Sequence, residues 1–234
     1  MTQHNGFFGS VWEKNAPQSF NEVAIADSNT KLDLEDYVRF KQLKGNIILE
    51  GGFGSGKTTI AQVIAKERTD NPLNTIEING AAWQTDTLTT LTNTYNWARS
   101  SGEVPVVIIN EVDRLKEKQY DLRVFLDDNK NTGLVIMTTN YLGNMDGSIV
   151  DRSEVFHIKG FTPQQAVPIA QTLLKRKGVT ISDENLEKLF ASKLLGEETE
   201  LSLRQIGRIV DRLVMLNTQT PPQPPQKGSG LRVV

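Results

Sequence analysis

Residues 51–58 read GGFGSGKT and fit the pattern G-x-x-x-x-G-K-[ST]. The apolar run Asn46–Leu49 precedes this pattern, and the helix-like segment Thr58–Lys66 follows it. In that context the glycines let the backbone curl so that successive N–H groups point at phosphate oxygens, and the start of the helix adds a partial positive charge. We therefore predict a phosphate-binding loop; the alternative is a glycine-rich turn with a chance lysine.

The residues of this loop have distinct expected tasks. Lys57 is expected to reach the β- and γ-phosphates of a nucleotide, and the Thr58 hydroxyl is expected to ligate Mg²⁺. The predicted cofactor-binding residues here are Gly51, Gly52, Phe53, Gly54, Ser55, Gly56, Lys57, Thr58 and Thr59. ATP and Mg²⁺ are the predicted cofactors. A GTPase is disfavoured because Asn129–Thr132 lacks the aspartate of the base-reading pattern N-K-x-D.

Apolar, β-rich runs alternate with helix-like segments across the middle of the chain. The strand candidates are Asn46–Leu49, Thr75–Ile78, Val104–Ile109 and Leu134–Thr138, and the helices between them are Thr58–Lys66, Thr85–Ser100 and Lys116–Asp127. This rhythm predicts an α/β fold with a parallel sheet flanked by helices. After Phe161 only helices are expected, at Pro163–Lys177, Asp183–Leu195 with Asp183 as a cap, and Leu203–Leu216.

Four parts of the chain follow from this pattern. We expect an N-terminal segment over residues 1–42, an α/β nucleotide-binding domain over 43–160 and a small helical domain over 161–217. Residues 218–234 contain PPQPP and QKGSG, a composition typical of an extended, flexible tail.

Composition excludes several classes of protein. Among 234 residues, 26 are basic and 28 acidic, a net charge of −2 that excludes a polybasic, histone-like protein but not a locally basic surface formed on assembly. The absence of cysteine excludes disulfides, a thiolate zinc site and a cysteine nucleophile, and two histidines, His4 and His157, make a histidine-rich metal site improbable. No apolar run approaches the ~20 residues that a membrane span needs, and the N-terminus lacks a signal-peptide pattern, so we expect a soluble, cytoplasmic protein without membrane association.

The strand Val106–Ile109 ends in the pair Asn110-Glu111. Polar residues at this edge of a sheet, beside a phosphate loop, are typical of a Walker B site: the first holds Mg²⁺ and the second, Glu111, polarises the attacking water. Asn110 stands where most such sites carry aspartate, and it keeps an oxygen but loses the negative charge. We predict weaker Mg²⁺ dependence and slower turnover, while nucleotide binding is largely kept. Asn110→Asp should then change both the ATPase rate and the Mg²⁺ affinity. The alternative is a strand that ends in solvated polar residues.

Asn140 follows a third strand, Leu134–Met137. Its place in the chain predicts a side chain between the γ-phosphate and the Walker B pair, where it orients the lytic water. An ordinary turn asparagine is the alternative reading.

At this point the chain resembles the AAA+ ATPases, and most closely the clamp-loader branch that includes replication factor C subunits and the T4-type phage clamp-loader ATPase. Trp12–Pro17 resembles the N-terminal pattern W-x-E-K-Y-R-P, with Asn15-Ala16 in place of Tyr-Arg, and Asn110–Leu115 resembles D-E-x-D-x-L. The resemblance implies a five-stranded parallel sheet and an all-helical lid. It also implies that Pro17 and Val23 lie beside adenine, and that Gln119 and Arg123 couple DNA contact to the ATP site.

The same resemblance assigns two arginines. Residues 148–158, SIVDRSEVFHI, resemble the stretch whose arginine reaches a neighbouring subunit's ATP site, which implies this role for Arg152, although Asp151 and Ser153 replace the usual serine and cysteine. Arg204 opens the last helix and is expected to bridge the lid to the γ-phosphate. A surface salt bridge is the alternative for Arg152, and Arg208 competes with Arg204.

The functional expectation is an ATPase that assembles with itself or homologous AAA+ subunits around DNA and loads a sliding clamp. The family's collar domain has no counterpart after the lid, so we expect assembly without it. The alternatives are a DNA-dependent assembly factor, such as a helicase loader or transposition regulator, and a structural subunit that binds ATP without hydrolysis. The candidate DNA-phosphate contacts are Thr85, Arg114, Lys116 and Lys118. Glu111 and the lid disfavour a small-molecule kinase.

Overall fold

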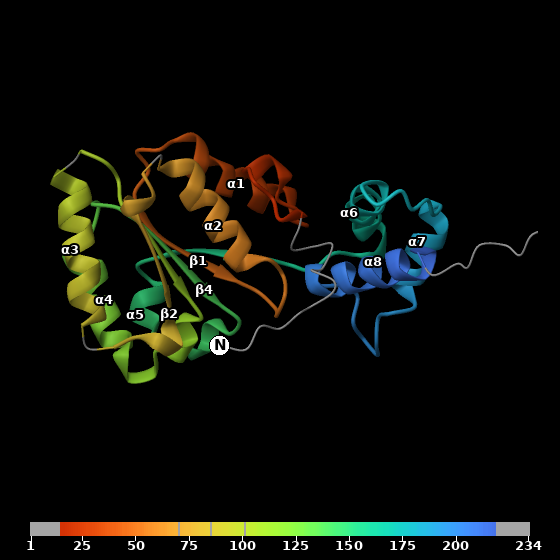
Figure 1. The fold of residues 1–234 in the computed structure, drawn as a ribbon. Coiled ribbons are helices and arrows are strands. Elements are labelled where there is room, and N and C mark those ends of the chain that lie inside the picture. The colour runs from red at the N-terminus through yellow and green to blue at the C-terminus, as the bar shows by residue number, and fades with distance from the viewer. Residues whose placement is uncertain (1–14, 70, 85, 101, 219–234) are drawn as a thin grey trace, which may run out of the picture.

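The structure is a computed structural model that describes residues 15–69, 71–84, 86–100 and 102–218. A sheet of five parallel strands forms its centre (Figure 1). The strands are β1 (Gly45–Glu50), β2 (Thr75–Asn79), β3 (Val106–Asn110), β4 (Leu134–Thr139) and β5 (Glu154–His157). Their order is β2-β3-β4-β1-β5, and every neighbouring pair is parallel. The predicted α/β fold with a five-stranded parallel sheet is confirmed.

Helices cover both faces of this sheet. They are α1 (Ser28–Arg39), α2 (Lys57–Arg68), α3 (Thr87–Ser100), α4 (Gln119–Asp128) and α5 (Gly147–Val150). Side chains alternate along β1, so Ile47 and Leu49 join the core beneath α1 and α2, whereas Ile48 joins the core beneath α3, α4 and α5. Figure 1 shows α1 and α2 together on one side of the sheet, and α3 and α4 at its other side.

The burial of the strands explains their apolar composition. Every residue of β3 and β4 is buried, because these strands lie in the middle of the sheet with helices on both faces. Parallel strands bring their carboxyl ends to one edge of a sheet. The phosphate loop, Asn110 and Thr139 therefore share that edge.

Three helices form a separate bundle: α6 (Pro163–Lys175), α7 (Asp183–Ala191) and α8 (Leu203–Thr218). They pack around their own core, and Ala24 and Ala26 of the N-terminal segment lie against it. Thr162 and Gln165 cap the start of α6 reciprocally, which fixes where the chain leaves the sheet. Figure 1 shows α6, α7 and α8 beside the sheet, joined to it by a single connection after β5.

Three local expectations about the helices are wrong. α4 begins at Gln119 instead of Lys116, because Lys116 adopts a left-handed conformation with φ of 50° and Lys116–Lys118 forms a 3₁₀ turn. The cap of α7 is Ser182, whose hydroxyl accepts the Asn185 N–H, so Asp183 is already helical. α7 also ends at Ala191, four residues before the predicted end.

Among the described residues, no helix combines the length and the apolar character that crossing a membrane requires. The helix α1 occupies most of the latter half of the N-terminal segment and packs on α2.

Candidate nucleotide-binding site

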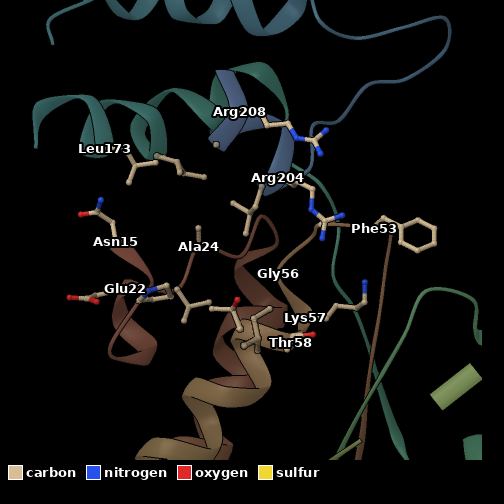
Figure 2. Close-up of a pocket in the computed structure, with 18 of the residues that line it drawn as sticks. Asn15, Glu22, Ala24, Phe53, Gly56, Lys57, Thr58, Leu173, Arg204 and Arg208 are labelled. Atoms are coloured by element: carbon tan, nitrogen blue, oxygen red, sulfur yellow. The ribbon is translucent and has the colours of Figure 1, made fainter. Parts of the chain in front are cut away.

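A cavity of about 710 Å³ lies between the phosphate loop, the start of α2, the N-terminal segment and the helices α6 and α8. The predicted residues that border it are Pro17, Val23, Phe53, Gly54, Gly56, Lys57, Thr58, Thr59, Glu111, Asn140 and Arg204. Figure 2 shows Arg204 and Arg208 projecting from α8 on one side of this space, with Lys57 and Thr58 at the start of α2 on the other. Gly51, Gly52 and Ser55 border a second hollow of about 370 Å³ instead.

The phosphate loop is in direct contact with the start of α8. Gly54 and Gly56 have φ of 78° and 97°, a left-handed conformation that glycine adopts without strain. A side chain at Gly54 would come within 2.7 Å of Arg204 Cβ, and the backbone N–H of Arg204 donates to Gly54 O at 3.2 Å. The lid therefore rests on the loop at the residue expected to sense the γ-phosphate.

Lys57 lies at the centre of the site and is 8% exposed. Its Nζ donates to the carbonyls of Gly51 and Gly52 at 2.7 and 2.9 Å, and to Asn140 Oδ1 at 3.0 Å. Burial lowers the pKa of this ammonium, and the nearby carboxylate of Glu50 partly opposes the shift. A phosphate group arriving here offers oxygens that can replace the carbonyl partners.

Asn110 is buried behind Thr58 and lies outside the cavity wall. Its Oδ1 accepts the hydroxyls of Thr58 at 3.0 Å and Thr138 at 3.1 Å, while its Nδ2 donates to Glu77 Oε1 at 2.7 Å. The amide oxygen therefore faces the Thr58 hydroxyl, as a shared magnesium site requires.

The oxygen donors at this edge suit Mg²⁺, which prefers hydroxyl, amide and carboxylate oxygens. No group of three or more histidine, cysteine or acidic side chains within the described ranges could hold a metal ion. The oxygens of Thr58 and Asn110 fit an ion that takes its remaining ligands from nucleotide phosphates and water.

Glu111 has an unusual backbone conformation, with φ of 55°. Its N–H donates to Thr138 Oγ1 at 3.2 Å, and its carboxylate lies 3.2 Å from Arg114 Nε and 3.4 Å from Asn79 Nδ2. Residues held in this sparsely populated region cluster at functional sites. Arg114 and Asn79 hold the Glu111 carboxylate at the border of the cavity.

Arg152 lies at the opposite edge of the sheet. Its backbone carbonyl accepts Asn46 Nδ2 at 3.0 Å, at the beginning of β1, whereas the phosphate loop follows the end of that strand. A six-residue strand spans about 20 Å. Arg152 therefore does not border the cavity of its own chain.

Comparisons with known proteins agree with this geometry. Residues 47–161 match the family described as "ATPase family associated with various cellular activities (AAA)". This stretch therefore has the fold of an AAA+ ATPase domain. A RuvB variant from Thermotoga maritima has a similar fold, with a TM-score of 0.63, 20% identity, and coverage of 86% of this chain and 67% of that chain.

Two curated relatives resemble the AAA+ chain in sequence. The mitochondrial Lon protease homolog of Candida albicans is 25% identical over 228 residues, covering 76% of this chain and 20% of the relative. Lon protease 4 of Sorangium cellulosum is 26% identical over 200 residues, covering 68% and 24%. The AAA+ chain spans a quarter or less of these relatives, and the activity in their names belongs to those whole proteins.

Other residues singled out in the AAA+ sequence have varied surroundings. Lys118 Nζ donates to Trp83 O at 2.9 Å, and Arg114 pairs with Glu111, so two candidate DNA contacts have partners within the chain. Gln119 is buried and bonds the backbone of Asn144 and Asp146.

The remaining residues lie on the surface or outside the described residues. Lys116 is exposed, and Arg123 stacks on the ring of Tyr120 at 4.7 Å. His4, Trp12, Thr85 and the tail beyond Thr218 lie outside the described residues.

Several residues of the AAA+ site were not predicted from the sequence. Glu77 and Asn79 of β2 contact the Walker B pair, and Asp113 accepts the Thr139 hydroxyl at 3.0 Å. The signal for the first two was present as alternate polar residues in the strand TIEIN. The cavity wall also contains Asn15, Glu22 and Arg176, and Arg176 Nη1 donates to Asn15 Oδ1 at 2.8 Å.

Proposed function

We propose that this AAA+ domain binds Mg²⁺–ATP in the cavity beneath α8 and hydrolyses it. The observation that carries the proposal is the 3.0 Å contact between Lys57 Nζ and Asn140 Oδ1. It joins the phosphate loop to the end of β4 at a cavity that Glu111 and Arg204 also border. Three strand ends and the lid converge on one space, which is what γ-phosphate chemistry requires.

In this proposal the residues divide the work of hydrolysis. The loop from Gly51 to Thr59 and the Lys57 ammonium hold the phosphates, and Thr58 and Asn110 hold Mg²⁺, which when bound offsets phosphate charge. Asn140 orients a water molecule. Glu111 accepts its proton as the new bond to the γ-phosphorus forms, and the bond to the bridging oxygen breaks to leave ADP.

The wall of the cavity away from the phosphates suits a nucleotide base. Pro17 and Val23 supply apolar contacts there, and Leu173 of α6 borders the same space (Figure 2). The backbone N–H of Arg204 donates to Gly54 O, which ties the start of α8 to the phosphate loop. The Arg204 side chain can therefore contact the γ-phosphate and transmit its presence to the lid. We propose these residues as the base-side and sensing groups.

Arg152 completes the site of a neighbouring copy in this account. It is 38% exposed and lies at the edge of the sheet opposite its own phosphate loop. Only a second subunit, either this chain or a homologous AAA+ subunit, can bring such a group to the γ-phosphate. The proposed active form is therefore a ring or spiral.

Activity measured as a function of protein concentration tests the proposal. Wild type is expected to hydrolyse ATP with a rate per subunit that rises on assembly. Lys57→Ala should remove ATP binding, whereas Arg152→Ala should remove hydrolysis alone. Arg39→Ala is the control, because Arg39 is an exposed arginine at the end of α1 whose guanidinium lies over the ring of Phe40. Equal activity of wild type and Arg152→Ala would contradict the proposed assembly.

We further propose that the assembly surrounds DNA, as in clamp-loader-like replication machinery. The Walker B pattern Asn110–Leu115 supports this version, and the exposed Lys116 is the candidate phosphate contact whose side chain is not committed to Glu111 or Trp83. The test is ATPase stimulation by primer–template DNA and a sliding clamp. Stimulation by DNA alone, with filaments in electron micrographs, would instead support the helicase-loader or transposition-regulator alternative.

A further inference from the structure

Asn110 and Glu77 form a direct contact in which the chain places a carboxylate beside the Walker B position. Glu77 Oε1 accepts Asn110 Nδ2 at 2.7 Å. Asn110 supplies an amide where a Walker B aspartate would supply a negative charge. That charge is present one strand away, on β2.

Sheet register explains why these two side chains meet. Glu77 pairs with Ile108, and Asn79 pairs with Asn110, so Glu77 and Asn110 lie on the same face of neighbouring strands. This is the face that α2 covers, because Ile108 belongs to the core beneath α2. The contact is thus built into the parallel pairing of β2 with β3.

The helix α2 holds the carboxylate from the other side. Gln62 Nε2 donates to Glu77 Oε1 at 3.1 Å and to Oε2 at 2.9 Å. Gln62 lies one turn after Thr58, on the same side of α2. Thr58, Asn110, Glu77 and Gln62 therefore form a chain of hydrogen bonds between the helix and two strands.

The chemistry of the partners decides which end of the Asn110 amide faces the nucleotide. An ionised carboxylate only accepts hydrogen bonds, so Glu77 requires the NH₂ end. The Thr58 and Thr138 hydroxyls can donate or accept, and would tolerate either end. In the structure Thr138 accepts the Glu111 N–H and donates its own proton to Asn110 Oδ1, which agrees with the end of the amide that Glu77 selects. Without Glu77, an NH₂ group could face Thr58, and nitrogen of an amide does not bind Mg²⁺.

We infer that Glu77 is a positioning residue for Mg²⁺: it fixes the Asn110 amide with its oxygen toward Thr58 and returns a negative charge to the site. This inference rests on the proposed ATP site. It also revises the expectation for Asn110 alone, because the asparagine and the glutamate act as a pair. Loss of such an outer partner typically lowers metal affinity about 10- to 100-fold.

The test measures binding of a fluorescent, non-hydrolysable ATP analogue while Mg²⁺ is titrated. Glu77→Ala should raise the half-saturating Mg²⁺ concentration about tenfold, with affinity in EDTA unchanged. Glu77 is exposed, so the variant is expected to fold, and thermal unfolding checks this. Glu184→Ala is the matched control, because it removes an exposed glutamate paired with Lys188 far from the site.

A second background separates amide positioning from a general charge effect. In Asn110→Asp both ends of the side chain are oxygens, so no amide remains to be oriented. Glu77→Ala should then leave the half-saturating Mg²⁺ concentration unchanged or lower. The non-additivity of the two substitutions is the signature of the pair.

Three outcomes overturn the inference. Unchanged Mg²⁺ dependence in Glu77→Ala, while wild type binds the analogue with Mg²⁺, overturns it and leaves the proposed function standing. If Glu77→Ala raises the half-saturating Mg²⁺ concentration equally in the wild-type and Asn110→Asp backgrounds, the positioning role is overturned. If wild type binds no nucleotide at all, the proposed function and the inference both fail.

Discussion

Arg152 and Asp127 form a two-point ion pair on the surface, with Nε 2.6 Å from Oδ1 and Nη2 3.3 Å from Oδ2. Arg152 Nη1 also donates to Ser148 O at 2.7 Å. The hydrogen bond from Arg152 lowers the pKa of the Asp127 carboxyl and raises that of the guanidinium. Both groups are charged at neutral pH, so the role that we propose for Arg152 in a neighbouring copy requires that it first leave Asp127.

Asp127→Asn should release this arginine. Because exposed ion pairs are weak, we expect the ATPase rate of the assembled protein to rise by roughly two- to fivefold. The effect should shrink at high salt, where the pair is already screened. Asp128→Asn, one residue along α4, is the control. Steady-state ATPase assays that give equal rates for Asp127→Asn and wild type would remove Asp127 from the account.

Glu111→Gln should separate hydrolysis from binding. The substitution removes the proton acceptor but keeps the side-chain shape, so hydrolysis should fall by roughly 10²- to 10⁴-fold while ATP affinity stays within about twofold. Single-turnover kinetics with equilibrium binding gives both quantities. Glu117→Gln, an exposed neighbour, is the control. A parallel loss of binding would show that Glu111 is structural.

Two glycines of the phosphate loop provide a matched comparison. Gly54→Ala strains a left-handed backbone and drives a methyl group against Arg204 Cβ, so it should cost about 1–3 kcal/mol of unfolding free energy and weaken ATP binding. Gly52 lacks both constraints, and Gly52→Ala should stay within about 0.5 kcal/mol. Denaturant unfolding measures the difference. Equal effects of the two substitutions would contradict the contact between loop and lid.

The pKa of Lys57 gives ATP binding a pH dependence. Burial lowers this pKa below its ordinary value of 10.5, so the ammonium loses its proton at a lower pH than an exposed lysine does. ATP affinity should be constant near neutrality and fall as pH rises through the lowered pKa. In the free protein, the contribution of this group to unfolding free energy rises over the same range, because the unfolded state binds the proton more tightly.

Binding titrations between about pH 7 and pH 10, with circular dichroism to confirm folding, check this prediction. An ATP affinity that stays constant over this whole range would show that Lys57 is not the group that holds the phosphates.

The sequence predicted the fold well because its signals are local. The apolar runs that became β1, β3 and β4 and the glycines before Lys57 each specify their own conformation. Strand order is a property of long-range pairing, so no run of residues reveals that β3 lies between β2 and β4. The same limit explains the errors at α4, where Leu115 and Gln119 flank a turn that helical periodicity alone does not reveal.

In the candidate site, too, the residues that belong to a local motif were predicted, and those that depend on long-range contacts were not. The loop, Glu111 and Asn140 carry motif spacing, and their sequence order predicted that they border one cavity. Glu77, Asn79 and Asp127 carry no motif, since each acquires its partner from another element only after the sheet forms. Away from the site, Arg68 also carries no motif. Its buried guanidinium donates to carbonyls between α1 and β1, including that of Lys41 at 2.8 Å.

Mixing two inactive variants tests the central claim most directly, namely that each ATP site is completed by Arg152 of a neighbouring copy. Lys57→Ala lacks a working phosphate site but keeps Arg152, and Arg152→Ala keeps the phosphate site but lacks the arginine. Alone, each should be inactive. Mixed in equal amounts, they should recover roughly a quarter of the wild-type ATPase rate, because about one interface in four pairs an intact site with an intact arginine. If the mixture stays inactive while both variants still assemble, or if Arg152→Ala alone matches wild type, the claim is contradicted.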